Sequence, residues 1–363
     1  MNIIVDLSVL ELPATGIAKV ITGLYRAVAA QRPDILLRGI HRRPLASALP
    51  PSIRTDRVSS LLTPGLWRRF GIRRALRHSI DSVLHFPWNG QVPLLPREMR
   101  VVTTMHDVLP LTIPGYFARE DLAHAYQRER QADIDRSSVV ITDSEFSKRE
   151  ITRHLRVERE PIVIPCGTDI GTYAATAAKP GYPYFLYVGG LDPRKSVDML
   201  LRVFVRLASE RMLDSKLIVT GSRRHAPASI TTLLDDGVRR GHILYRGYVD
   251  DDELANLYAG ALGLVYPSRY EGFGMPPLEA MTLGCPVITC REASIPEVCG
   301  EAAYYVTPAD ERSLTTALTT IERDPAMRLR LASEGRARAA KFSWDRAAKK
   351  FLDVLELSFP SHQ

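Results

Sequence analysis

The sequence predicts an α/β protein built from two doubly wound domains in series, and three observations support this fold class. Short apolar runs alternate with segments of helical spacing along the chain, which is typical of parallel sheets with helices on both faces. A stretch at 166–183, rich in Gly, Ala, Thr and Pro and without periodicity, interrupts the alternation as a linker would. The 363 residues, 45% hydrophobic and 25% charged, suffice for two globular domains.

The first domain is expected at 1–165. It begins with a continuous apolar strand at 2–8, and the spacing of apolar residues predicts a helix at 16–30. These residues are Ile17, Val20, Ile21, Leu24 and Val28. Further strands are expected at 35–40, 82–86, 100–105, 138–142 and 161–164, with helices at 119–136 and 144–154.

The second domain, expected at 184–342, repeats the alternation. Its strands are expected at 184–188, 216–220, 242–245, 261–266, 286–289 and 302–306. Its helices are expected at 197–208, 228–239, 251–259, 311–323 and 325–341. A last amphipathic helix begins at Ser343, within 343–363, and places Ala347, Phe351, Val354 and Leu355 on one face.

Positive charge is concentrated in the first domain. Residues 1–100 carry 15 Lys and Arg against 6 Asp and Glu, a net of +9, whereas the other residues carry 33 against 35, a net of −2. A basic surface can bind nucleic acid. Aromatic residues make up only 7% of the chain and no recognition motif is present, so a nucleic-acid-binding protein is the remote alternative.

The sequence predicts a cytoplasmic protein with reduced thiols. It has no run of eighteen apolar residues, and residues 1–6 begin a strand without the regions of a signal peptide. The cysteines show neither metal-ligand nor redox spacing, and we expect buried thiols. They are Cys166, Cys285, Cys290 and Cys299.

The most informative stretch is 268–279, which joins an apolar strand to a helix that opens with prolines. A Gly-rich turn between a strand end and a helix start presents backbone N–H groups to an anion, so the spot suits a phosphate. Glu271 in the turn and Glu279 in the helix carry carboxylates, which accept hydrogen bonds from hydroxyl groups. A phosphate site beside hydroxyl acceptors indicates a sugar nucleotide.

The pattern Glu-Gly-Phe-Gly-Met-Pro-Pro-Leu-Glu-Ala-Met at 271–281 resembles the signature of retaining glycosyltransferases of family 4. These enzymes have the GT-B fold, in which two Rossmann-like domains face each other across a cleft. The resemblance implies that 1–165, with 343–363 packed back on it, is the acceptor-side domain and that 184–342 binds the donor. It implies donor contacts from Glu271, Gly272, Phe273, Gly274, Met275 and Glu279.

Two cations, Arg194 and Lys195, follow the first strand of the second domain. Fixed cations stabilise the negative charge that develops on a diphosphate leaving group. By the resemblance Lys195 is the diphosphate-binding lysine, but Gly190 stands where many members have an arginine, which leaves open whether Arg194 supplies the second charge. A solvated Arg-Lys turn is the alternative.

Three further segments match the family. His106-Asp107-Val108-Leu109-Pro110 looks like the His-Asp-x-x-Pro motif beside the transferred sugar, with a structural histidine as the alternative. Gly16 is similar to a glycine near the donor phosphates, although it can also be a simple helix cap. By the resemblance, Tyr248 and Val249 frame the nucleobase. We expect His106, Lys195 and Glu271 to be the catalytic residues.

Asp250-Asp251-Asp252 is similar to the metal-binding motif of another glycosyltransferase fold. Here the three aspartates precede a helix, and we expect them to cap it. The prediction is therefore an enzyme without metal or other cofactor, with a nucleotide sugar as co-substrate.

The resemblance implies a hexosyltransferase, and the segments around His106 and Lys195 favour mannose from GDP-mannose, transferred by front-side displacement. The expected acceptor is a growing polysaccharide or lipid-linked glycan, as in O-antigen and lipopolysaccharide synthesis. A UDP- or dTDP-sugar donor stays open. So does a non-transferase sugar-nucleotide enzyme of the same fold, although an epimerase lacks the turn with two glutamates.

Residues 66–78 combine five arginines with apolar side chains. Trp67 and Phe70 are expected to enter the headgroup layer of an anionic membrane while the arginines meet its charge, which makes the protein peripheral on the inner face of the cytoplasmic membrane. An arginine-rich helix packed on the domain is the alternative.

Overall fold

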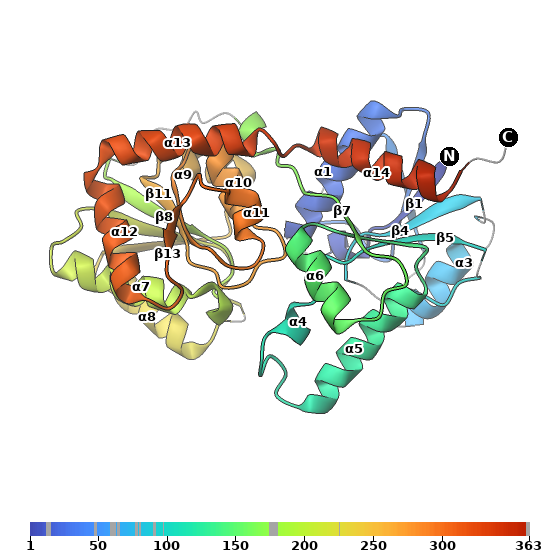
Figure 1. Cartoon of the computed structure of the whole chain (residues 1–363), viewed down its shortest axis with the longest axis horizontal. Coiled ribbons are helices and arrows are strands. Elements are labelled where there is room, and N and C mark those ends of the chain that lie inside the picture. The colour runs from blue at the N-terminus through green and yellow to red at the C-terminus, as the bar shows by residue number, and fades with distance from the viewer. Residues whose placement is uncertain are drawn as a thin grey trace. The chain divides into compact units, whose positions relative to one another are not determined.

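The computed structural model describes residues 1–11, 16–46, 49–58, 63, 66–76, 79, 81–89, 92–96, 98–173, 181–224 and 226–360. The chain divides into two compact units (Figure 1). The first unit comprises Met1–Gly167 and Phe342–Gln363, and the second comprises Thr168–Lys341. The predicted linker is thus shared between the units, and its residues 174–180 lie outside the described part.

The first unit is built on a seven-stranded parallel sheet with the order β3-β2-β1-β4-β5-β6-β7. The strands are β1 (Asn2–Asp6), β2 (Leu36–His41), β3 (Ile53–Arg57), β4 (Ser82–Phe86), β5 (Arg100–Thr104), β6 (Val139–Thr142) and β7 (Ile162–Val163). The helices are η1 (Ser8–Glu11), α1 (Gly16–Gln31), η2 (Trp67–Ile72), α3 (Arg73–Ala75), α4 (Leu109–Thr112), α5 (Glu120–Asp135) and α6 (Glu145–His154). Since β1 lies between β2 and β4, the direction of winding reverses there, as in other open α/β sheets.

The last helix, α14 (Trp344–Ser358), packs against α1 of the first unit (Figure 1). A Cβ at Gly23 would lie 2.2 Å from the Trp344 ring, so only a glycine lets the indole approach α1 so closely. Phe351 packs edge-on against Tyr25 with ring centroids 6.0 Å apart. Gln31 Nε2 donates to the carbonyl of Asp345 over 2.8 Å. The amphipathic face that the sequence predicts is therefore buried on the first unit.

The second unit holds a six-stranded parallel sheet with the order β10-β9-β8-β11-β12-β13. The strands are β8 (Tyr184–Val188), β9 (Lys216–Thr220), β10 (Ile243–Gly247), β11 (Gly263–Tyr266), β12 (Val287–Cys290) and β13 (Tyr304–Val306). The helices are η3 (Ile170–Thr172), η4 (Pro193–Lys195), α7 (Val197–Ser209), α8 (Ala228–Arg239), α9 (Asp251–Gly260), α10 (Met275–Thr282), α11 (Ile295–Cys299), α12 (Glu311–Arg323) and α13 (Pro325–Ala339). Its winding reverses between β8 and β11.

The two parallel α/β sheets confirm the predicted fold class, and most predicted elements are present within two residues at each end. The sequence prediction missed β3, because this edge strand buries only Ile53 and shows no apolar run. It also missed α4, a single turn that contains Pro110. All four cysteines are buried and free, as expected.

The prediction for the basic segment 66–78 was wrong at Trp67. Its side chain is 1% exposed and packs among buried residues of the first unit, and its indole Nε1 donates to the carbonyl of Val58 over 3.2 Å. Leu66 and Phe70 are 45% and 52% exposed. Arg77 and His78 lie outside the described residues, as do the side chains of Arg68, Arg69 and Arg74. In the described part of the chain, no helix is both long and apolar enough to cross a membrane.

Candidate active site

The loops that follow β8 and β11 are neighbours, because these two strands pair in the sheet of the second unit. Winding reverses between them, and in open α/β sheets ligands bind at such a point beyond the carboxyl ends of the strands. The loops are tied together by the Arg269 amide, which donates to the carbonyl of Arg194 over 3.0 Å. The Arg194 guanidinium also donates to the carbonyl of Tyr270 over 2.6 Å.

The structure brings Arg194, Lys195 and Glu271 into direct contact. Glu271 Oε1 lies 2.8 Å from Lys195 Nζ and 3.1 Å from the Arg194 guanidinium. The same oxygen accepts hydrogen bonds of 2.7 Å from the hydroxyls of Tyr266 and Ser268. Asp192 Oδ2 also lies 3.5 Å from Arg194 Nε, so the cluster pairs two cations with two carboxylates. The alternative of a solvated Arg-Lys turn is excluded for Lys195, which is 8% exposed.

Charges within the cluster fix its ionisation. Burial alone would raise the pKa of the Glu271 carboxyl, but the charges of Lys195 and Arg194 and the donated hydrogen bonds outweigh it and hold that pKa at about 2. Burial lowers the pKa of the Lys195 ammonium, and the nearby Arg194 acts in the same direction against the pull of Glu271. Glu271 is therefore a carboxylate at neutral pH, and its partners within the protein are Lys195, Arg194 and the hydroxyls of Tyr266 and Ser268.

The turn from Gly272 to Met275 is shaped by Gly274, whose φ of +114° suits glycine. A Cβ there would also lie 2.9 Å from Ile295 Cδ1. The Ser294 hydroxyl holds the turn by donating to the carbonyls of Glu271 and Phe273 over 2.8 Å and 2.7 Å. Since prolines occupy the next two positions of α10 and have no N–H, the amides that can face an anion here are those of the turn and Met275, fewer than a full helical turn offers.

Glu279 lies on α10 and is 3% exposed. Its Oε2 accepts a hydrogen bond of 3.1 Å from the Tyr258 hydroxyl of α9. The two motif glutamates thus occupy different polar environments, Glu271 among cations and Glu279 beside a tyrosine.

Glycines with positive φ follow β8 and β9, at Gly189 and Gly221, and Gly247 with positive φ ends β10. The sequence prediction missed Gly221. A Cβ at Gly221 would lie 2.2 Å from the carbonyl oxygen of Gly189, so the two strand ends approach closely only because this residue is glycine. Tyr248 and Val249 follow β10, the edge strand, and Tyr248 is 68% exposed. The Glu271 cluster lies beyond the inner strands β8 and β11, away from this edge of the sheet.

Asp250 caps α9, and its side chain accepts from the Glu253 amide over 2.8 Å, as predicted. Asp251 accepts from the Tyr173 hydroxyl over 3.3 Å. Within the described ranges, no group of three His, Cys, Asp or Glu side chains is placed to hold a metal ion.

In the first unit, His106 follows β5 and is held by acceptors on both ring nitrogens. Nδ1 lies 2.6 Å from Asp143 Oδ2, and Nε2 lies 3.1 Å from the carbonyl of Pro87. Two acceptors require two N–H donors, so the geometry favours the imidazolium. Burial would lower the pKa of His106, but the charge and hydrogen bond of Asp143, with Pro87 and Asp107, raise it above its ordinary value. Nearby His85 stays neutral, because burial and the charge of His106 lower its pKa to about 3.

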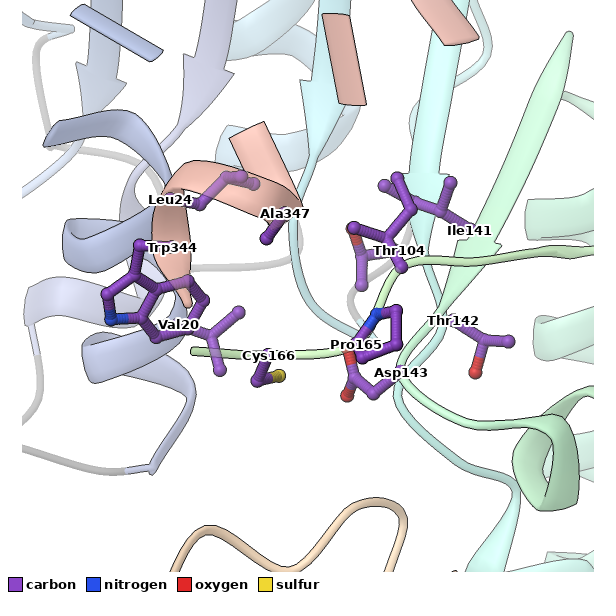
Figure 2. A pocket seen from close by; sticks show the side chains of 11 residues that line it. Val20, Leu24, Thr104, Ile141, Thr142, Asp143, Pro165, Cys166, Trp344 and Ala347 are labelled. Carbon is purple, nitrogen blue, oxygen red and sulfur yellow. The ribbon is translucent and has the colours of Figure 1, made fainter. Parts of the chain in front are cut away.

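Asp143 was not predicted from the sequence, since it is 37 residues from His106. Behind it lies a cavity of about 20 Å³, enough for one water molecule, which is shown in Figure 2 with its lining side chains. Cys166 and Asp143 lie close together there, and burial, then the charge and hydrogen bond of Asp143, raise the pKa of the Cys166 thiol. The thiol is therefore protonated at neutral pH.

Gly16 begins α1 beyond the carboxyl end of β1, where winding reverses in the first unit. No described atom lies within 4 Å of the position that a Cβ would take, so packing in the described part gives no reason for glycine here. Ala14 and Thr15, which precede it, lie outside the described residues.

Comparison with known proteins agrees with this architecture. Family models described as glycosyltransferase family 4 and as glycosyl transferases group 1 match residues 14–172 and 182–324. The chain is 28% identical to the O-antigen chain mannosyltransferase B of Escherichia coli, over 98% of this chain and all of that protein. It is 28% identical to an O-antigen chain mannosyltransferase of Salmonella typhimurium, over 76% of each.

Among solved structures, a glycosyltransferase involved in lipopolysaccharide biosynthesis, WaaG, superposes with a TM-score of 0.76 at 17% identity, covering 99% of this chain and 100% of that one. Sucrose-phosphate synthase from Thermosynechococcus elongatus gives a TM-score of 0.76 at 20% identity, with 99% of each chain covered. The fold and the loops beyond β8 and β11 define a glycosyltransferase of the GT-B class. The chain carries a family 4 glycosyltransferase domain at 14–172 and a group 1 glycosyl transferase domain at 182–324.

Proposed function

We propose that this glycosyltransferase moves mannose from GDP-mannose onto a growing polysaccharide or lipid-linked glycan of the O-antigen kind, with retention of configuration. The donor site is supported by one observation above all, the contact of Arg194, Lys195 and Glu271 at the reversal point of the second sheet. The sugar and the acceptor are supported by the relatives, which are O-antigen chain mannosyltransferases.

In this proposal the donor diphosphate binds Arg194 and Lys195, and the amides of the turn from Gly272 to Met275 add to the site. To bind there, the diphosphate must share or replace Glu271 as the partner of Arg194 and Lys195. Negative charge on the leaving diphosphate grows as the glycosidic bond breaks, so fixed cations stabilise the transition state more than the ground state. Glu271, released toward the sugar, then accepts from its hydroxyls.

Glu279 binds the ribose hydroxyls, and Tyr248 and Val249 frame the base. Gly16 and His106 of the first unit serve the phosphates and the transferred sugar. For His106 Nε2 to donate to the sugar, a sugar oxygen must share or replace the carbonyl of Pro87 as its acceptor. The bond from C1 to the phosphate oxygen breaks as the bond to the acceptor oxygen forms on the same face, and the acceptor proton passes to the leaving diphosphate. No metal ion is required, because Arg194, Lys195 and the turn amides already supply positive charge.

A donor screen tests the proposal. Nucleotide sugars are added one at a time, and thermal stability and nucleotide release are measured. A donor at a hundredfold excess over its Kd raises the unfolding free energy by about 2.7 kcal/mol. We expect GDP-mannose to raise the thermal stability and to release its nucleotide. If only UDP- or dTDP-sugars do so, the mannose assignment is wrong and the assignment as a glycosyltransferase stands.

We also propose that the basic first unit binds anionic membrane, with Leu66 and Phe70 as the apolar contacts in place of the buried Trp67. Each cation near an anionic surface contributes about 1 kcal/mol. Co-sedimentation with anionic and neutral vesicles compares wild type with Arg68, Arg69, Arg73 and Arg74 changed to Glu. Selective loss of anionic-vesicle binding supports the proposal, and equal binding by both proteins contradicts it.

A further inference from the structure

The first unit has an open groove of about 410 Å³ between α4 and α5, within the size range of ligand sites. The residues that line it include Pro110, four residues after His106 in the sequence, and His154 of α6. We call it the α4–α5 groove. Its lining includes Pro110, Tyr116, Phe117, His124, Gln127 and His154.

Aromatic rings form the apolar part of this groove. Tyr116 is 51% exposed and packs edge-on against Phe117, with ring centroids 5.2 Å apart. Phe117 in turn lies 5.7 Å from the ring of Tyr126. An exposed ring backed by two others is a rigid, amphipathic platform, suited to the apolar face of a sugar ring.

The polar part of the groove is rich in hydrogen-bonding groups and nearly neutral. Gln127 Nε2 donates to the carbonyl of His154 over 2.9 Å, and Arg119 pairs with Asp121 over 2.7 Å. His124 lies 4.0 Å from Glu120. One arginine and one glutamate line the groove, so their charges cancel and the lining favours an uncharged polyol over a phosphate.

A chain of contacts connects the α4–α5 groove to His106. Asn89 Oδ1 accepts from the His106 amide over 2.8 Å, and Asn89 Nδ2 donates to the carbonyl of Asp107 over 2.7 Å. The Tyr126 hydroxyl lies near the same asparagine side chain, which acts on its pKa. Tyr126 therefore lies between Asn89, which contacts His106, and Phe117 of the aromatic platform.

We propose that the α4–α5 groove binds the sugars of a neutral oligosaccharide acceptor that lie beyond the one receiving the transferred residue. This inference rests on the proposed function, which places the transferred sugar at His106. Stacking on Tyr116 and hydrogen bonds from Gln127 and His124 then hold a glycan chain, so that long acceptors bind better than short ones.

The test compares Tyr116→Ala with two controls, Tyr116→Phe, which keeps the ring, and Leu122→Ala, which removes a 45% exposed side chain elsewhere on α5. Acceptors run from a monosaccharide to a tetrasaccharide of mannose. For Tyr116→Ala we expect KM to rise about tenfold for the tetrasaccharide and to stay unchanged for the monosaccharide. Donor hydrolysis without acceptor, and both controls, should match wild type. An equal change for both acceptors, or no change, overturns the proposal.

A second measurement tests glycan binding in the groove independently of the glycosyltransferase assignment. Saturation-transfer NMR records binding of the mannose tetrasaccharide to the full chain without any donor. Wild type and Tyr116→Phe should bind, and Tyr116→Ala should lose the signal. If transfer fails with every donor but this pattern holds, the proposed function is wrong and the glycan site remains; if wild type and Tyr116→Ala bind alike, the groove is not the glycan site.

Discussion

The contact between Lys195 and Glu271 predicts different effects of the same variants on stability and on turnover. At a separation of 2.8 Å and an effective dielectric constant of about 20, the two charges attract by about 6 kcal/mol before the cost of burying them. Lys195→Met removes one partner, and breaking a buried pair costs about 3–5 kcal/mol. Because Glu271 keeps Arg194, Tyr266 and Ser268 as donors, we expect the lower end, about 3 kcal/mol.

For a unit of this size, a loss of about 3 kcal/mol lowers Tm by about 6–12 °C. The double variant Lys195→Met with Glu271→Gln removes both charges of the pair and leaves Arg194 beside Asp192, 3.5 Å away. It should recover most of that loss, giving a coupling energy of about 2 kcal/mol. Turnover should behave differently. Both the single and the double variant lack the cation at the leaving group, so kcat should fall about a hundredfold in each.

Differential scanning calorimetry of the full chain measures Tm, and steady-state kinetics with a saturating donor measures kcat. Stability losses that simply add in the double variant would refute the pairing as a stabilising contact. Recovery of kcat together with Tm would refute the role of Lys195 at the leaving group.

Three further predictions concern single features of the site. Glu279→Ala should raise KM for the donor about tenfold with little change in kcat, since a ribose contact is present throughout the reaction; a lower kcat at unchanged KM would contradict this. Activity should persist in EDTA, because Arg194 and Lys195 supply the positive charge, and a loss of activity that added metal reverses would sink metal independence and make Asp250–Asp252 the candidate ligands. The folded pKa of His106 lies above its unfolded value of about 6.5, so the pair with Asp143 contributes its full stability below about pH 6.5 and loses it as pH rises through the folded pKa. Asp143→Asn should therefore lower Tm more at about pH 6 than at about pH 9. An equal loss of Tm at both pH values would rule out the charged pair.

The sequence predicted those parts of the fold whose signal is local. Apolar runs mark the inner strands because both faces of a parallel sheet are buried, whereas β3 at the edge, with Arg54 and Asp56 toward solvent, carries no such mark. Trp67 was misplaced for a related reason. An amphipathic pattern tells which residues are apolar, and only the packing of Trp67 against the first sheet tells whether the partner is protein or lipid.

At the site, the residues on strand-end loops could be found from sequence, but their partners could not. Glu271 and Lys195 are 76 residues apart, and His106 and Asp143 are 37 apart, so each pairing depends on which strands lie side by side. The Tyr266 and Ser268 hydroxyls also point at Glu271, which a motif of two glutamates does not indicate. Gly221 carried a possible signal, a glycine directly after a strand, as at Gly189.

The central claim is that Arg194 and Lys195 bind the diphosphate of the donor. Isothermal titration calorimetry of GDP and GMP tests it directly, because the two ligands differ only in the β-phosphate. Wild type should bind GDP far more tightly than GMP, and the double variant Arg194→Met with Lys195→Met should bind the two alike. Arg202→Met, which removes an exposed arginine of α7, is the matched control and should retain the preference. A double variant that still prefers GDP as strongly as wild type would contradict the account.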